Sequence, residues 1–111
     1  IRFEKIHTIR ENYDLWSKRI DMVNRGEAVI HIRQWIGRPY HTKQQMIKVL
    51  TRCSYQKLGM CYATEEELAS NDGLDLIDFY SWFKTTRITF LKKCYHYIII
   101  QFTEFKYKET V

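Results

Sequence analysis

The stretch Lys5-Ile6-His7-Thr8-Ile9-Arg10 stands just before an asparagine that can cap a helix, and it places a lysine, a histidine, a threonine and an arginine within six residues. Side chains of a strand point alternately to two faces. Thr8 would then share a face with Arg10, while Lys5 would share the other face with His7. A lysine beside a threonine hydroxyl is a base beside a nucleophile, but only a bend or a helical turn would bring Lys5 next to Thr8. An ordinary solvated strand end is the alternative interpretation.

The rest of the first half predicts one helix and two strands. Asn12 can cap a helix that runs to about residue 23, and Gly26 supplies its stop. Apolar residues alternate with polar ones over residues 28–35, which predicts a strand. Residues 46–53 predict a second strand, and the proline-containing segment between the two is expected to be a loop.

The second half predicts two short helices and a long final strand. Thr64 and Glu67 fit a capping box at the start of the first helix, which should end at the turn signal of residues 71–73. Asp75 can cap the second helix, and the β-branched and aromatic residues of 95–107 predict a strand. This order predicts an α+β fold, with a curved sheet or small β-barrel flanked by short helices.

Length and charge restrict the class of protein. The chain has 111 residues, enough for a single domain over 1–111 with one core. It begins with Ile1, so we expect an N-terminal element to be missing. Residues 1–60 carry twelve Lys and Arg against five Asp and Glu, a net charge of +7, whereas residues 61–111 have a net charge of −2. The basic half favours an anionic partner such as a nucleic acid or a nucleotide, although many basic domains bind nothing anionic.

The cysteines indicate a reducing compartment. Cys53, Cys61 and Cys94 are odd in number, and none belongs to a C-x-x-C pair. Free cysteines in the cytoplasm are therefore expected, with no disulfide framework, no zinc site and no cofactor. The longest apolar run, residues 97–100, is too short to span a membrane.

Basic and aromatic residues gather around the predicted loop. The rings of Trp35 and Tyr40 are surrounded in the sequence by Arg33, Arg38, His41 and Lys43. Basic side chains can hold phosphates while exposed aromatic rings stack on bases, which favours RNA as a partner. The alternative is that both rings cover the end of the core and the charges are simply solvated.

The hexapeptide resembles the signature of the ASCH domain family, which belongs to the PUA-like β-barrel superfamily. Three further segments resemble uncharacterised bacterial members of that family in their order and spacing. They are the stretch from Trp35 to Gln44 with its glycine, proline and tyrosine, the stretch Asn71 to Phe83, and the strand Ile98 to Phe102. The resemblance implies a PUA-like barrel, RNA binding, and a bacterial or phage cytoplasm.

One branch of that family consists of small amidohydrolases that remove the acetyl group from 4-acetylcytidine. Its Lys-x-x-Thr-x-Arg motif matches Lys5, Thr8 and Arg10, and Asp72 stands near the place of a glutamate in that branch. The resemblance implies Thr8 as nucleophile, Lys5 as base and Asp72 as the carboxylate that orients Lys5 or shuttles a proton. Arg10 could lower the pKa of the lysine or hold a substrate oxygen, and His7 is a second candidate base.

Three functional classes stay open. The first is a binding domain for RNA or a modified nucleoside, with a basic cleft lined by Lys5, Thr8, Arg10 and Asp72. The second is the amidohydrolase, which must bind the same kind of base and also needs an essential hydroxyl at Thr8. The third is an accessory protein without a ligand, which could form a homodimer or bind another protein.

Overall fold

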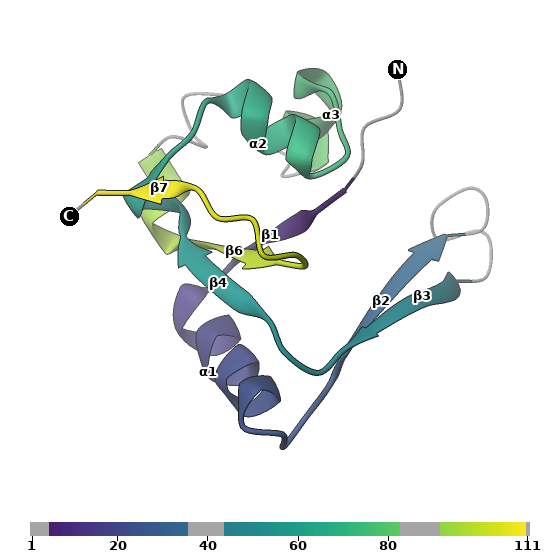
Figure 1. The fold of residues 1–111 in the computed structure, drawn as a ribbon. Helices are drawn as coiled ribbons and strands as arrows, with labels where there is room; N and C mark the ends of the chain where they lie inside the picture. Colours follow the sequence, from purple (N-terminus) through teal and green to yellow (C-terminus); the bar gives the residue numbers. More distant parts are fainter. Residues whose placement is uncertain (1–4, 36–43, 83–91, 111) are drawn as a thin grey trace.

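The computed structural model describes residues 5–35, 44–82 and 92–110 (Figure 1). Its helices are α1 (Tyr13–Asn24), α2 (Glu65–Asn71) and α3 (Leu76–Trp82). Its strands are β1 (His7–Glu11), β2 (Ile30–Trp35), β3 (Gln44–Leu50), β4 (Ser54–Lys57), β5 (Cys61–Tyr62), β6 (Tyr97–Gln101) and β7 (Lys108–Glu109). Short 3-10 turns cover Leu58–Met60 and Cys94–His96. The predicted α+β class is confirmed.

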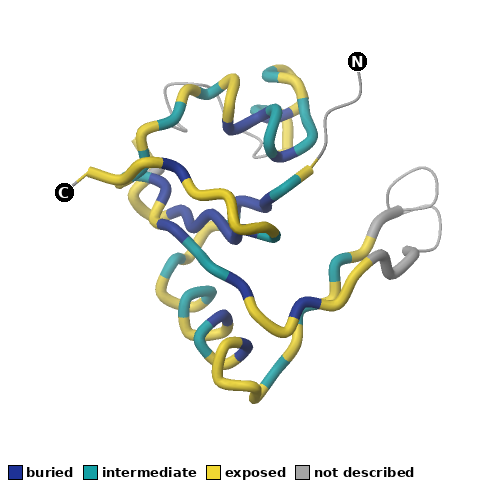
Figure 2. Tube along the Cα trace, in the orientation of Figure 1, coloured by how far each residue is buried: buried dark blue, intermediate teal, exposed yellow. Residues whose placement is uncertain are grey.

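The centre of the molecule is a three-stranded antiparallel sheet in the order β1-β6-β4. All five residues of β6 are buried (Figure 2). In the β1–β6 ladder His7 lies opposite Gln101 and Thr8 lies opposite Ile100. Successive residues of a strand face opposite sides, so His7 and Thr8 point to different sides of this sheet.

Helices cover both faces of this sheet, with α1 on one side and α2 and α3 on the other (Figure 1). Ile98 and Ile100 of β6 pack in a cluster with Ile20 of α1. Ile99, between them in sequence, packs in a second cluster with Phe79 of α3. β6 is therefore apolar on both faces, the pattern expected of a strand buried between two layers.

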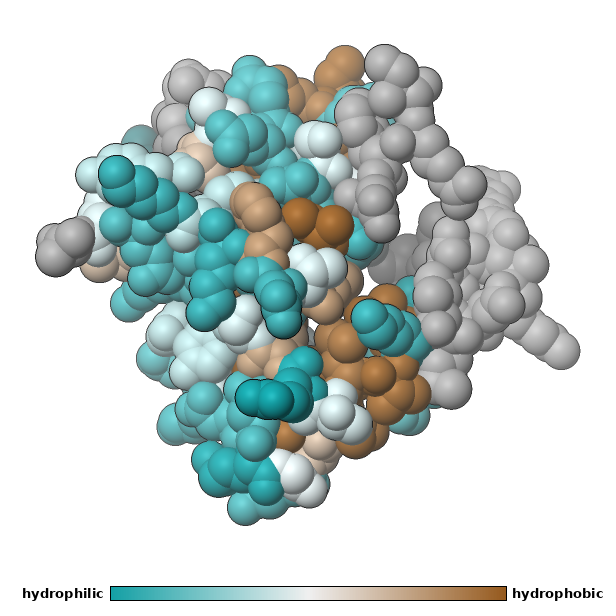
Figure 3. Space-filling view, viewed as in Figure 1, coloured by the Kyte–Doolittle hydropathy of each residue, from teal (hydrophilic) through white to brown (hydrophobic). Residues whose placement is uncertain are grey.

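The other strands form two smaller antiparallel sheets, β2–β3 and β5–β7. The β2–β3 hairpin extends away from the body of the molecule (Figure 1). Apolar side chains gather over the end of the hairpin nearest the body, with hydrophilic residues beside them (Figure 3). Among the described residues these sheets are not joined into a closed barrel, so only the coarser part of the fold prediction is confirmed.

The predicted helix starts and stops follow local side-chain chemistry. Asn12 Oδ1 accepts a hydrogen bond from the amide of Leu15 at 3.2 Å, and Gly26 ends the helix region with φ of 80°. Asp75 Oδ1 accepts from the amide of Asp78 at 2.8 Å. Each cap satisfies an amide that has no partner inside the helix.

Of the two hydrogen bonds predicted for the capping box at α2, the described residues form one. Thr64 Oγ1 accepts from the amide of Glu67 at 3.1 Å, as predicted. The Glu67 carboxylate accepts a hydrogen bond from the Thr64 hydroxyl at 3.3 Å instead of reaching the backbone amide of Thr64. α2 ends at Asn71, in agreement with the turn signal there.

The prediction of one strand over residues 95–107 was wrong, and β4 was missed. β6 ends at Gln101, and the chain then turns, with Thr103 Oγ1 accepting from the amide of Phe105 at 3.2 Å. Beyond the turn, the side-chain amide of Gln56 bonds to the backbone of Tyr107, with Nε2 donating to the carbonyl at 2.8 Å and Oε1 accepting from the amide at 2.9 Å. A buried side chain thus takes the place of a neighbouring strand, which residue propensities do not reveal.

Other expectations are only partly covered by the structure. Most of the predicted loop and the segment 83–91 lie outside the described residues. Within the described part of the chain, no helix is long and apolar enough to cross a membrane. In that same part, no group of three or more His, Cys, Asp and Glu side chains could hold a metal ion.

Two free cysteines are partly or fully buried in this fold. Cys53 donates from Sγ to the carbonyl of Gln101 at 2.9 Å, and burial raises its pKa to about 11. Burial, together with the charge of Glu109, raises the pKa of Cys61 to about 11. A cysteine in an unfolded chain titrates near 9.0, so the folded state holds these protons more tightly.

We expect the free energy of unfolding to fall between about pH 9 and pH 11, because over that range the unfolded thiols lose protons that the folded ones keep. Below pH 9 both states hold the protons and this contribution is constant. Urea unfolding midpoints measured across the range would show the fall. A Cys53→Ala/Cys61→Ala variant should show a shallower fall, and equal slopes in the two proteins would contradict the assignment.

Candidate functional site

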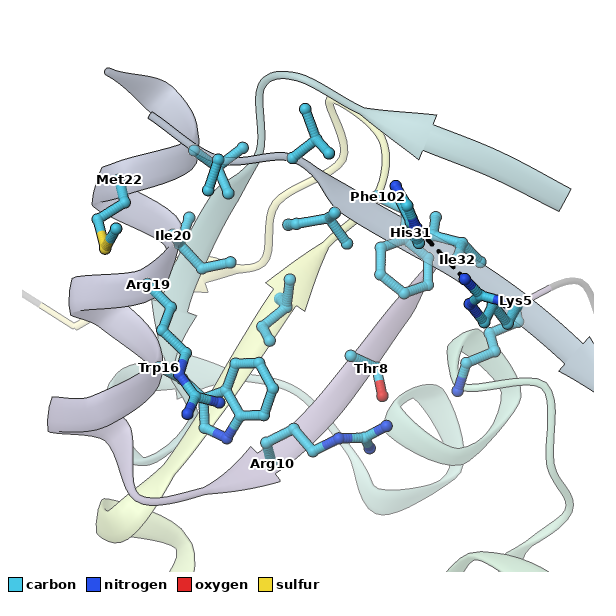
Figure 4. A pocket seen from close by; sticks show the side chains of 16 residues that line it. Lys5, Thr8, Arg10, Trp16, Arg19, Ile20, Met22, His31, Ile32 and Phe102 are labelled. Carbon is cyan, nitrogen blue, oxygen red and sulfur yellow. Dashed lines mark hydrogen bonds between the residues drawn. The ribbon is translucent and has the colours of Figure 1, made fainter. Parts of the chain in front are cut away.

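A cavity of about 580 Å³ lies between β1, α1 and β2 (Figure 4). Its lining combines apolar side chains, the rings of Trp16 and Phe102, and a set of basic side chains. The apolar and aromatic members include Ile20, Val23, Ile30, Ile32 and Ile100, and the basic members are Lys5, Arg10, Arg19, His31 and Arg33. No Asp or Glu belongs to the lining formed by the described residues.

Thr8 supplies a buried hydroxyl to this cavity. The register of β1 places Thr8 opposite Ile100, and both side chains line the cavity. Thr8 is 7% exposed, and its Oγ1 has no hydrogen-bond partner among the described residues. Burying an unpaired hydroxyl costs roughly 1–3 kcal/mol. The Thr8 hydroxyl is therefore available to a polar group of a bound molecule.

Lys5 reaches the same cavity because it lies before β1 rather than within it. The amide of Ile6 donates to the carbonyl of Asn71 at 2.8 Å, which ties this segment to the end of α2. Gly73 has φ of 79°, and a Cβ there would lie 3.1 Å from the Cβ of Lys5. The turn after α2 can therefore pack closely against Lys5, with a glycine at the point of contact.

Three arginines add positive charge without a carboxylate partner among the described residues. Arg10 donates to the carbonyl of Ile9 at 3.0 Å, and the Arg19 guanidinium lies 4.9 Å from the centre of the Trp16 ring. Among the described polar groups, Arg33 contacts only the ring of His31, with Nη2 3.5 Å from Nδ1. No ion pair joins these arginines to a described Asp or Glu. Their charge is consequently not neutralised by the described part of the protein and can attract an anionic group.

Figure 4 shows where the three side chains of the predicted Lys-x-x-Thr-x-Arg motif lie in the cavity. The amine of Lys5, the hydroxyl of Thr8 and the guanidinium of Arg10 point toward the same part of the cavity. This arrangement brings together three residues of the Lys-x-x-Thr-x-Arg pattern, although Lys5 and Thr8 would face opposite sides in one regular strand.

Asp72 and His7 do not line the cavity. Asp72 is 3% exposed and contacts Lys5 Nζ twice, through Oδ1 at 3.2 Å and through its backbone carbonyl at 3.3 Å. His7 is fully buried on the other side of β1, with Nδ1 3.3 Å from Asp72 Oδ1 and Nε2 2.7 Å from Tyr107 Oη. Asn71 Nδ2 donates to the same hydroxyl at 2.8 Å. Burial raises the pKa of Tyr107 to about 12, so this hydroxyl keeps its proton at neutral pH.

The remaining predicted residues belong to the segment for which the sequence predicts a loop, or lie next to it. Trp35 ends β2, but its side chain lies outside the described part of the structure. Arg38, Tyr40 and Lys43 lie outside the described residues altogether. The proposed stacking surface around them stays a prediction.

Several residues of the site were missed by sequence reasoning. Trp16 and Arg19 are three residues apart on α1, a spacing that places them side by side and could have been recognised. Phe102 and Tyr107 come from the last part of the chain, and no local pattern links them to residues 5–10. Their contribution depends on the pairing of β1 with β6.

No family model, no curated protein and no solved structure matches this chain. The function is therefore inferred from the chemistry of the cavity and of the residues around it.

Proposed function

We propose that this cavity binds a base of RNA or of a modified nucleoside. The basic side chains of the cavity would contact the phosphate groups or other oxygen atoms of that ligand. The supporting observation is a cavity of about 580 Å³ that combines apolar and aromatic walls with five basic side chains and no described carboxylate. Ligand-binding pockets are typically about 300–1,000 Å³, mostly apolar, and contain a few placed polar groups.

Each part of the lining has a role in this proposal. A flat base packs against the apolar wall, where its polar edge meets the unpaired hydroxyl of Thr8, which can both donate and accept. Arg10, Arg19 and Arg33 have no described carboxylate partner and can bind phosphate oxygens, for which the planar guanidinium is suited. Salt-dependent binding follows from such contacts.

The resemblance to the ASCH family supports the same class of ligand. We extend the proposal to the fold, and assign the described α+β unit to the PUA-like type, in which RNA binding is common. Under this proposal the protein acts in the cytoplasm, where RNA and its nucleosides are available.

Substituting Arg19→Gln should weaken binding of a cytidine-containing RNA oligonucleotide about tenfold, because one charge-assisted hydrogen bond to phosphate is lost. The salt dependence of the affinity should become less steep by about one unit in the double-logarithmic plot. Fluorescence anisotropy at several salt concentrations measures both effects. Arg52→Gln is the matched control, since Arg52 is exposed and does not line the cavity. Equal losses in the two variants would contradict a specific cavity site.

A second candidate function is hydrolysis of an acylated nucleoside such as 4-acetylcytidine. The observation that favours it is the convergence of Lys5 and Thr8 on one cavity, where the Thr8 hydroxyl has no described partner. In this reaction a proton first moves from the Lys5 amine to Asp72 Oδ1, 3.2 Å away, and Thr8 Oγ then attacks the acyl carbon while its own proton passes to the Lys5 amine. Lys5 then protonates the leaving amine, and water releases the acyl group from Thr8. Arg10 points to the same region and can stabilise the oxyanion, while Asp72 holds Lys5 in place.

Under this second candidate, Thr8→Val should abolish deacetylation of 4-acetylcytidine and leave binding of cytidine within a few-fold. Valine keeps the shape of threonine but removes the hydroxyl, so the chemical step is lost while binding loses at most one hydrogen bond. Product formation followed by chromatography and affinity measured by calorimetry separate the two effects. Turnover that survives in Thr8→Val would remove Thr8 as the nucleophile, and its absence in the unaltered protein would leave the binding function alone.

A further inference from the structure

A continuous chain of hydrogen bonds lies behind the cavity and leads to Lys5. It links, in this order, the side chains of Asn71, Tyr107, His7 and Asp72, and Asp72 contacts Lys5. Asn71 Nδ2 donates to Tyr107 Oη, so the Tyr107 proton is free to be donated to His7 Nε2, 2.7 Å away. An Nε2 that accepts leaves the ring proton of a neutral histidine on Nδ1. That nitrogen faces the Oδ1 of Asp72, which also receives Lys5 Nζ.

We infer that His7 is a positioning residue, which acts through Asp72 to hold the amine of Lys5 at the cavity. The inference deepens the proposed function. It rests on that function only in so far as Lys5 is taken to contact a ligand. His7 does not touch the cavity itself. Its effect on a ligand passes through one shared carboxylate oxygen.

The geometry explains why Asp72 needs this support. Its backbone is fixed, because its amide donates to the carbonyl of Leu68 at 3.0 Å at the end of α2. Its side chain is almost fully buried, and a buried carboxylate needs hydrogen-bond donors. Lys5 is 45% exposed and, as a long flexible side chain, loses conformational freedom when it is held. A rigid donor from buried His7 keeps Asp72 oriented so that one of its oxygens stays on Lys5.

Two substitutions of His7 separate positioning from simple core filling. In His7→Asn the side-chain amide stands near the place of Nδ1 and can still donate to Asp72. In His7→Gln the amide stands near the place of Nε2, where it meets Tyr107 and not Asp72. Gln is closer to His in size, so a purely packing role predicts that His7→Gln is the milder change. Positioning predicts the opposite order.

The first readout needs no ligand. Acylation of the Lys5 amine by a small reagent, followed by mass spectrometry, should become several-fold faster in His7→Gln and stay near the unaltered rate in His7→Asn. The affinity for the cytidine-containing RNA oligonucleotide should fall in the same order. Equal behaviour of the two variants, or a larger effect in His7→Asn, would overturn the inference.

A measurement on the unaltered protein keeps the inference testable if neither variant folds. Nitrogen-15 NMR of His7 at neutral pH should show a proton on Nδ1 and none on Nε2, and the reverse tautomer would overturn the inference. The proposed function fails separately. If the unaltered protein binds no RNA or nucleoside while the two variants still differ in Lys5 acylation, the positioning role stands and the ligand assignment falls.

Discussion

The structure depends on the burial of β6 between β1 and β4. Every residue of this strand is buried, and its two faces supply the two apolar clusters that hold α1 on one side and α2 with α3 on the other. Because β1 pairs with β6 along its whole length, the alternation of a strand is imposed on the N-terminal motif. Thr8 and Arg10 are directed to the cavity, and His7 is directed to the opposite core.

Lys5 joins the two sides of this sheet. It lies just outside β1, so its side chain is not bound by the alternation and reaches the cavity while contacting Asp72. The cavity itself combines apolar and aromatic walls with basic side chains. The buried hydrogen-bonded chain behind it contains His7 and Tyr107, which belong to opposite ends of the sequence. Buried polar chains of this kind are stable only when each member is satisfied.

Much of the local structure could be read from the sequence because its causes are local. Asn12, Thr64 and Asp75 cap helices through contacts that span three residues, and Gly26 and Gly73 adopt the left-handed backbone their positions suggested. The final strand could not be read in the same way. Its residues favour β structure up to Tyr107, but the side chain of Gln56 takes over the backbone bonds of Tyr107 from 51 residues away.

The sequence by itself determined the helix caps and the predicted elements from which the α+β class follows, since these depend on neighbours a few positions apart. The choice of Lys5, Thr8 and Arg10 as residues of one site came from the family resemblance and not from their spacing. Only the tertiary structure decided which of the motif's residues face the cavity, that Asp72 supports Lys5 from behind, and that Trp16, Arg19 and Phe102 complete the lining. The physical reason is that these placements come from the pairing of β1 with β6 and the packing of α1 and α2 on its faces. Such contacts join residues far apart in the chain, so they cannot be predicted from the spacing of neighbouring residues.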